Sequence, residues 1–273
     1  MLLGAFVVAA VWNACGAKPG YELVWADEFD RPGLPDPAKW ACEEGFVRNR
    51  EAQYYATNAG TARVESGRLV IEARKERRLN PHYVEGASDW RRARRTTDYL
   101  SASLTTRGKA QWRYGRIEVR ARLPHGRGVW PAIWTLGTNI AVRGWPRCGE
   151  IDVMEFVGKQ PDKIYATVHF AGEDGRHVSR GNKGFSVERP WGAFHVYAIE
   201  WTERRIDFFF DGVRCHSFDV DEAGEGTDNP FREPHYLILN LALGGNWGGE
   251  IDDTVLPRRF EIDYVRVYRR RKS

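Results

Sequence analysis

The chain of 273 residues is long enough for one large domain and rules out a mini-protein. Lys and Arg number 41 against 37 Asp and Glu, and 42% of the residues are apolar, which argues against disorder and against a nucleic-acid partner. The 11 Trp, 11 Tyr and 13 Phe are the unusual feature, because such a density suits a thick β core or a platform for flat ligands.

The first seventeen residues, MLLGAFVVAAVWNACGA, are an apolar run that ends in small residues. This pattern is typical of a secretory signal peptide, and the run is too short to span a bilayer. We therefore predict a signal peptide over 1–17, a folded domain over 18–273, a secreted or periplasmic protein, and no integral membrane span. A lipid anchor at Cys15 and a buried strand of a cytosolic protein are the alternatives.

Short runs that alternate apolar and polar residues recur along the chain between turn signals. In RIEVRARL, for example, Ile117, Val119, Ala121 and Leu123 share one side and the charges share the other. No stretch keeps a helical apolar period over three turns, so we predict a single all-β domain, an antiparallel sandwich. The expected strands are 21–25, 68–73, 114–122, 151–156, 164–170, 194–201, 205–211, 236–243 and 260–268.

The segment 79–98 interrupts this rhythm and carries four arginines within five positions, residues 91, 92, 94 and 95. We predict a solvated loop there, since the whole chain is near charge balance, and a site for an acidic ligand is the alternative. The cysteines Cys42, Cys148 and Cys215 are far apart and lack a CxxC spacing, which predicts neither a zinc site nor a disulfide framework.

The segment GEIDVMEF concentrates acidic side chains. In a strand, Glu150 and Asp152 point to the same face, because side chains alternate with period two. Glu155 would point to the other face of a regular strand, and one extra residue at Val153 or Met154, a β-bulge, returns it. We therefore predict three carboxyl groups on one surface, with the solvent face of an edge strand as the alternative.

Tryptophans flank these acids: Trp130 and Trp134 lie upstream in GRGVWPAIWTLG, and Trp145 lies just before the acids. Indole faces suit the C–H faces of a pyranose ring, although one of Trp130 and Trp134 is expected to serve core packing. Two carboxyl groups beside an aromatic floor are what glycoside hydrolysis requires, one as nucleophile and one as proton donor. The third acid could tune the difference in pKa between them.

Besides EIDVMEF after WPAIWTLG, the chain contains the motifs WADEFD, NREAQYYATN, SGRLVIEARKE, WRYGRIEVRARLP and LILNLALGGNW. With these motifs in colinear order from Tyr21 to Tyr268, the sequence resembles glycoside hydrolase family 16. The branch it resembles is the bacterial laminarinase-type endo-β-1,3-glucanases. The resemblance implies a concanavalin-like β-jelly-roll sandwich with a concave substrate cleft, and a catalytic domain over 18–273. It also implies a retaining mechanism with Glu150 as nucleophile, Asp152 as its helper and Glu155 as acid/base.

The resemblance implies further site residues. Asn49, in a motif with Glu51, is expected to line the cleft, and so is His169, for which a purely structural histidine is the alternative. Asn246 is expected to border the cleft or to close a turn. Many relatives bind a structural calcium, which here would lie near Glu28, Gly67 and Asp263. No cofactor is expected for catalysis.

The predicted function is therefore hydrolysis of β-1,3 linkages in laminarin-type β-glucans by a monomeric enzyme. A mixed-linkage β-1,3-1,4-glucanase and a non-catalytic β-glucan-binding protein are the alternatives, since a fold does not fix a function. Binding relatives are expected to have lost the catalytic acids. All three acids are present in this sequence, which favours an enzyme.

Overall fold

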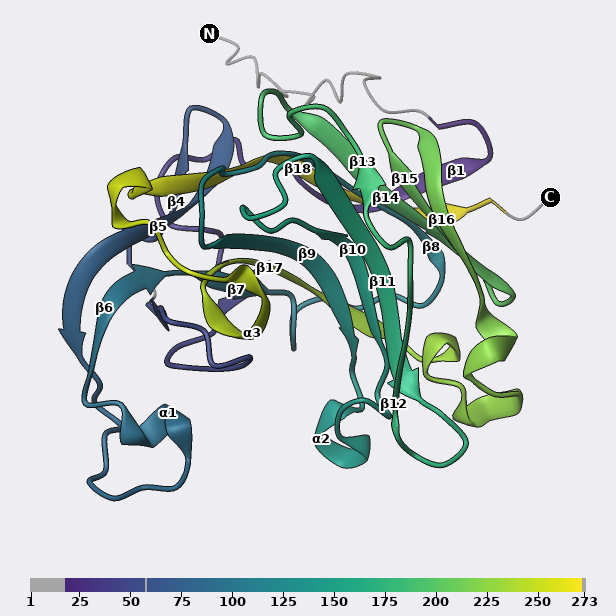
Figure 1. Ribbon diagram of the computed structural model, residues 1–273. Coiled ribbons are helices and arrows are strands. Elements are labelled where there is room, and N and C mark those ends of the chain that lie inside the picture. Colours follow the sequence, from purple (N-terminus) through teal and green to yellow (C-terminus); the bar gives the residue numbers. More distant parts are fainter. Residues whose placement is uncertain (1–17, 57, 272–273) are drawn as a thin grey trace, which may run out of the picture.

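A computed structural model describes residues 18–56 and 58–271, and these residues form two β-sheets packed face to face (Figure 1). The expected signal peptide and Cys15 lie outside the described residues. Over the described ranges, no helix has the length and apolar character needed to cross a bilayer. The all-β sandwich with jelly-roll architecture is confirmed.

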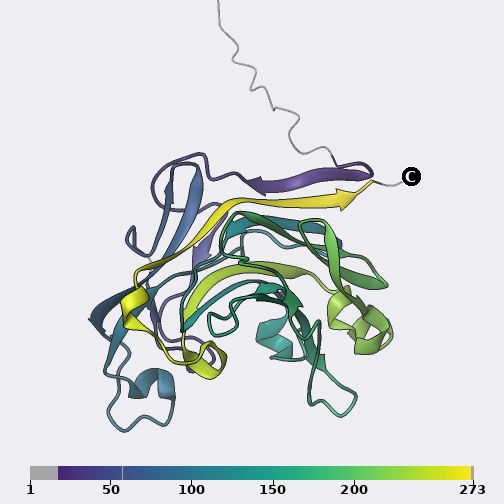
Figure 2. The ribbon, with the colours of Figure 1, turned by 45° about the horizontal axis from the view of Figure 1, so that its top comes forward.

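The outer sheet has the strand order β16-β15-β14-β8-β18-β5-β6-β3, with β1 paired to β18 and β4 to β5. Figure 2 shows β1 and β18 side by side, although they come from opposite ends of the chain. The strands are β1 (Tyr21–Asp27), β3 (Tyr54–Tyr55), β4 (Ala62–Glu65), β5 (Arg68–Leu79), β6 (Thr96–Ser101), β8 (Gly115–Arg122), β14 (His195–Trp201), β15 (Arg205–Phe210), β16 (Val213–Asp219) and β18 (Arg258–Arg270).

The inner sheet has the order β12-β11-β10-β9-β17-β7-β2, with β13 paired to β11. Its strands are β2 (Ala41–Cys42), β7 (Ser103–Thr105), β9 (Val129–Gly137), β10 (Glu150–Glu155), β11 (Lys163–Ala171), β12 (His177–Gly181), β13 (Phe185–Ser186) and β17 (His235–Leu243). The short helices are α1 (Trp90–Ala93), α2 (Ile140–Arg143), α3 (Gly245–Gly248), and the 3-10 turns Val220–Ala223, Gly226–Asp228, Pro230–Arg232 and Asp253–Val255.

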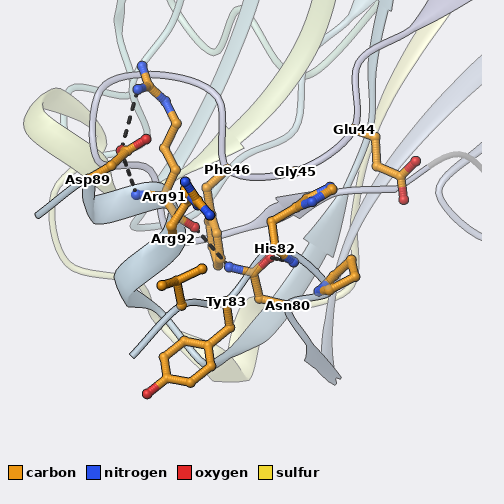
Figure 3. Close-up of a pocket in the computed structure, with 11 residues that line it drawn as sticks. Glu44, Gly45, Phe46, Asn80, His82, Tyr83, Asp89, Arg91 and Arg92 are labelled. Atoms are coloured by element: carbon orange, nitrogen blue, oxygen red, sulfur yellow. Dashed lines mark hydrogen bonds and ion pairs between the residues drawn. The ribbon is translucent and has the colours of Figure 1, made fainter. Parts of the chain in front are cut away.

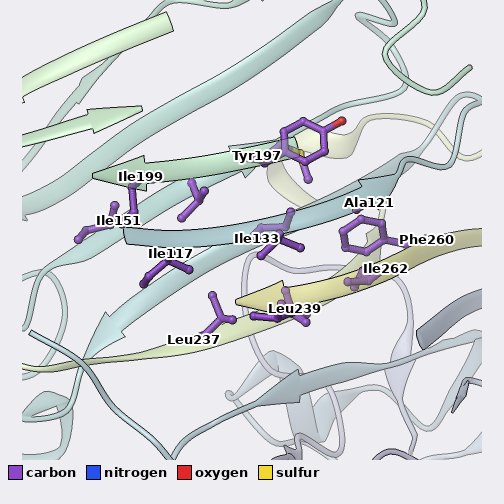
Figure 4. Close-up of a cluster of buried hydrophobic side chains, with 14 of the residues drawn as sticks. Ile117, Ala121, Ile133, Ile151, Tyr197, Ile199, Leu237, Leu239, Phe260 and Ile262 are labelled. Atoms are coloured by element: carbon purple, nitrogen blue, oxygen red, sulfur yellow. The ribbon is translucent and has the colours of Figure 1, made fainter. Parts of the chain in front are cut away.

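The core fills the space between the two sheets (Figure 4). Ile133, Ile151 and Leu237 of the inner sheet pack toward Ile117 and Ile262 of the outer sheet, and all of them are buried. The side of β8 expected to be apolar, from Ile117 to Leu123, is in this core, which confirms the period-two interpretation of that strand.

All nine expected strands are present, and β9 is a strand that the alternation did not predict. Each of its nine residues is buried. Val129 and Ile133 belong to the core between the sheets. Trp130 and Trp134 belong to two smaller clusters, Trp130 with Val157 and Trp134 with Tyr236. A strand covered on both faces has no alternation to detect, because neither face is solvent-exposed.

Candidate active site

A cleft of about 540 Å³ lies on the face of the inner sheet that points away from the core. Side chains from β9, β10 and β17 form its floor, and the segment 43–51 forms one wall. It brings together seven of the predicted site residues: Asn49, Trp130, Trp134, Trp145, Glu150, Asp152 and Glu155.

The β-bulge in β10 is present where the sequence predicts it. Asp152 pairs with Trp134 on β9, but Met154 pairs with the next residue along, Ile133, so Val153 is the extra residue. The side chains of Val153 and Met154 are both buried in the core. This arrangement turns Glu155 back to the cleft, where it joins the other two acids.

Glu150 and Asp152 both line the cleft, where burial favours the protonated form of each carboxyl group. Burial, followed by the charge of Asp152, raises the pKa of Glu150 to about 8. Burial raises the pKa of Asp152 to about 7. The indole N–H of Trp145 donates to Oε2 of Glu150 over 2.7 Å, which favours the ionised form of Glu150.

Glu155 accepts a hydrogen bond of 3.0 Å from the indole N–H of Trp130. Burial is the main cause that raises its pKa well above the ordinary range, and the charges of Asp152 and Glu150 add to it. Burial and the charges of the two neighbouring acids thus favour the protonated form of Glu155. A protonated carboxyl group beside an ionised one is the arrangement that glycoside hydrolysis uses.

His169 lies beside the acids as part of a pair of histidines. Its Nε2 is 3.0 Å from Oδ2 of Asp152, and its Nδ1 is 2.7 Å from Nε2 of His177. His177 also lies against Trp145, with ring centroids 4.6 Å apart. Because Trp145 holds Glu150, the two histidines and the indole connect Asp152 to Glu150 around one end of the cleft. His169 therefore contacts Asp152 directly, but it is not among the residues that line the cleft.

A second buried network lies at the other end of the floor. The indole N–H of Trp134 donates to Oδ1 of Asn240 over 2.7 Å, and Asn240 donates to the hydroxyl of Tyr55. That hydroxyl donates to Glu51, which also accepts from Asn49 over 3.4 Å. Asn49 has a φ of 54°, a left-handed conformation that Asn tolerates well. Both Asn49 and Glu51 thus line the cleft, and Glu51 also holds the side chain of Asn49.

The three predicted tryptophans differ in exposure. Trp130 and Trp134 both line the cleft, so neither is confined to core packing. Both are nevertheless buried, since only 8% of the surface of Trp130 and 6% of that of Trp134 is exposed. The Arg48 guanidinium covers one face of Trp134 at 4.9 Å from the ring centroid. Trp145 is 49% exposed and offers the largest open aromatic surface of the three.

Asn246 lies at the turn rather than in the cleft. It is exposed in α3, and its backbone N–H donates to the carbonyl oxygen of Asn49 over 2.9 Å. The next residue, Trp247, packs edge-on against Trp130. The GGNW segment therefore contacts two residues of the cleft, Asn49 and Trp130.

The carboxylates expected at a calcium site, those of Glu28 and Asp263, already have arginine partners. Arg266 donates to both oxygens of Glu28, and Arg120 donates to Asp263 over 2.6 Å. This arrangement does not fit a cation bound to those oxygens. In the described part of the chain, the group of acids and histidine with the spacing of a metal site is Glu150, Asp152 and His169, the catalytic candidates themselves.

Several cleft residues were not predicted: Arg48, Arg91, Arg107, Tyr236 and Asn240. Asn240 carries a detectable signal, since it is a polar residue inside the apolar run LILNLAL. The arginines carry none, because loops bring them to the cleft. Most of the segment 79–98 is exposed, as expected for a solvated loop, but half-buried Arg94 donates to the carbonyl of Glu51 over 2.7 Å and ties this loop to the cleft wall.

The comparisons agree with this geometry. The model of the glycosyl hydrolases family 16 matches residues 50–266. The chain is 44% identical over 264 residues to a beta-glucanase of Rhodothermus marinus, covering 92% of this chain and 86% of that protein. The X-ray structure of the R. marinus laminarinase superposes with a TM-score of 0.78 at 43% identity, covering 92% of this chain and 98% of that one.

A further solved structure comes from work on endo-acting O-glycanases that members of the human gut microbiota express to initiate mucin breakdown. It superposes with a TM-score of 0.87 at 38% identity and covers 93% of each chain. Both the family match and the gathering of three carboxyl groups in one cleft lead to the same conclusion: this chain belongs to the glycosyl hydrolases of family 16.

Proposed function

We propose that the protein is an endo-acting, retaining glucanase that hydrolyses β-1,3 linkages in laminarin-type glucans. The observation that carries the mechanism is the bulge in β10, which places Glu150, Asp152 and Glu155 in one cleft. The substrate is supported by the 44% identity to the R. marinus beta-glucanase and by the likeness to its laminarinase structure. Mixed-linkage β-1,3-1,4-glucan is the expected secondary substrate.

In the first step, an oxygen of ionised Glu150 attacks the anomeric carbon and forms an ester bond to it. The bond from that carbon to the glycosidic oxygen breaks, and Glu155 gives its proton to the leaving oxygen. Attack requires Glu150 in its ionised form, and protonation of Asp152 favours this form because it removes the negative charge that raises the pKa of Glu150. Trp145 holds the attacking carboxylate through its N–H.

In the second step, Glu155 acts as a base. Formation of the ester removes the negative charge of Glu150, which is one of the causes that raise the pKa of Glu155. Glu155 then accepts a proton from water, the water oxygen bonds to the anomeric carbon, and the ester bond breaks. Two inversions at one carbon give a product with the β configuration of the substrate.

A second candidate function is endo-acting hydrolysis of mucin O-glycans. The observation that favours it is the TM-score of 0.87 to the structure from the O-glycanase work, against 0.78 for the R. marinus laminarinase. A shared backbone does not fix the substrate, and the loops around the cleft decide it. Secretion and a monomeric state belong to the same proposal and rest on the sequence alone.

The experiment is a panel of substrates: laminarin, barley mixed-linkage glucan, cellulose and mucin O-glycans, assayed for new reducing ends and for product size. We expect laminarin to be cleaved fastest, with products of several lengths from the start. Faster cleavage of mucin O-glycans would establish the second candidate instead. Laminarin that binds but is not cleaved would identify a binding protein and overturn the assignment of catalysis.

A further inference from the structure

A second pocket, here called the loop pocket, lies beside the cleft and has a volume of about 420 Å³. Three segments line it: residues 44–46, 80–84 and 89–92 (Figure 3). This volume lies within the range of small-ligand sites. The role proposed above for the cleft makes no use of the loop pocket or of the arginine-rich loop that builds it.

The loop pocket is continuous with the cleft wall. Arg91 lines both spaces, and the segment 43–51 lines the loop pocket with Glu44 and Phe46 and the cleft with Val47 and Asn49. A glycan chain that leaves the cleft past Asn49 along this wall therefore meets the loop pocket next.

The loop is held in place by polar contacts to the cleft wall. Nε of Arg91 donates to the carbonyl of Val47 over 2.9 Å, and Arg94 donates to the carbonyl of Glu51 over 2.7 Å. The buried amide of Asn80 donates to the carbonyls of Arg91 and Arg94, each over 2.8 Å, which closes the loop on itself. A pocket fixed in this way loses little conformational entropy when a ligand binds.

The chemistry of the lining fits a neutral polyhydroxy ligand. Two acids and two arginines line the loop pocket. Both acids already have an arginine partner, Asp89 with Arg91 at 3.5 Å and Glu44 with Arg78 at 3.8 Å, so neither an anion nor a cation is favoured. The half-buried ring of Tyr83 adds an aromatic surface beside these donors and acceptors. Hydroxyl groups of a sugar can both donate to the acids and accept from the arginines, and a sugar ring packs on an aromatic face.

We propose that the loop pocket is a remote subsite that binds sugar units of the glycan chain lying beyond the units held in the cleft. The enzyme then binds long chains better than short ones. This inference rests on the proposed function only in that the ligand is the same glycan chain that the cleft cleaves.

The test compares Tyr83→Ala and Arg92→Gln with wild type on polymeric laminarin and on laminaritetraose. Both residues line the loop pocket and neither lines the cleft. Glu85→Gln, on the same loop but outside the lining, is the matched control. Thermal unfolding of each variant verifies that the fold is retained.

We expect KM for the polymer to rise about tenfold in each pocket variant, equivalent to about 1.4 kcal/mol of binding, with kcat and the tetraose kinetics unchanged. Equal losses on polymer and tetraose, or no loss on either, would overturn the remote subsite while leaving the glucanase proposal intact. A wild-type enzyme inactive on both would instead overturn the glucanase proposal. In that case the variants are compared on long and short mucin O-glycans. A rise in KM on the long glycans alone would support the remote subsite, and equal losses or no loss would overturn it.

Discussion

Nδ1 of His169 lies 2.7 Å from Nε2 of His177, so one of the two imidazoles must donate a hydrogen bond to the other. The opposite nitrogen of His169 faces Asp152. When Nδ1 of His169 accepts this hydrogen bond, Nε2 of His177 donates it. His177 thereby fixes the tautomer and orientation of His169, although it does not touch the acids itself.

We predict that His177→Ala lowers kcat by about tenfold, equivalent to about 1.4 kcal/mol, and changes the pH profile of kcat. His177→Gln, which can still donate from its amide, should recover much of the loss. Arg176→Gln alters the exposed neighbouring residue and is the control. An Ala variant with the pH profile and kcat of wild type would show that the histidine pair is not used.

Trp145 should tune Glu150 through its N–H rather than through its ring alone. Trp145→Phe keeps an aromatic ring and removes the donor to Oε2 of Glu150. Loss of a donor to the ionised form raises the pKa of Glu150, so the acidic limb of kcat/KM should move up by about one pH unit. The measurement is kcat/KM for laminarin from pH 4 to 10. An acidic limb that stays in place would assign Trp145 to sugar stacking only.

The raised pKa values also predict how stability depends on pH. A carboxyl group with a higher pKa in the folded than in the unfolded state binds more protons when folded, so stability falls as pH rises between the two values. For Glu150, whose pKa is raised from 4.5 to about 8, this window runs from about 4.5 to 8.

Replacing such a group by its neutral amide should therefore stabilise the protein above that window. We expect Glu150→Gln and Glu155→Gln each to raise Tm by about 2–4 °C at pH 8, equivalent to about 1 kcal/mol, with little change at pH 4.5. Glu173→Gln replaces an exposed glutamate and should leave Tm unchanged at both pH values. A lower Tm for both cleft variants at pH 8 would contradict the destabilising burial of these acids.

Calcium is tested by chelation. Because Arg266 and Arg120 already engage Glu28 and Asp263, we expect the same Tm in EDTA and in millimolar calcium. Arg120→Ala would free Asp263 and serves as the comparison. A rise in Tm with calcium in the wild type would show that an ion displaces these arginines, as the family resemblance implies.

The sequence predicted the parts of this molecule that follow from local pattern. Period-two alternation located β8 and β18, and the spacing of GEIDVMEF predicted the bulge, because both depend on which face each side chain takes. β9 was missed, since burial on both faces removes the alternation. Arg91 was missed because a loop brings it to the cleft from a distant segment, and His177 was missed because the pairing of β11 with β12 was not predicted.

The central claim is that Glu150 attacks the anomeric carbon and Glu155 supplies and recovers a proton. Glu150→Gln and Glu155→Gln should each lower kcat about a thousandfold or more while the fold is retained, because each amide keeps the shape and removes the reacting charge or proton. Circular dichroism verifies the fold. A tenth or more of wild-type kcat in either folded variant, about 1.4 kcal/mol of lost stabilisation, would assign that role to another residue.

The most direct measurement is proton NMR of laminarin hydrolysis, recorded from the first seconds before mutarotation mixes the anomers. Double displacement through Glu150 predicts that the β-anomer of the new reducing end appears first and that the α-anomer grows in later. An α-anomer that appears first would mean a single displacement by water, and would contradict the role of Glu150 as nucleophile.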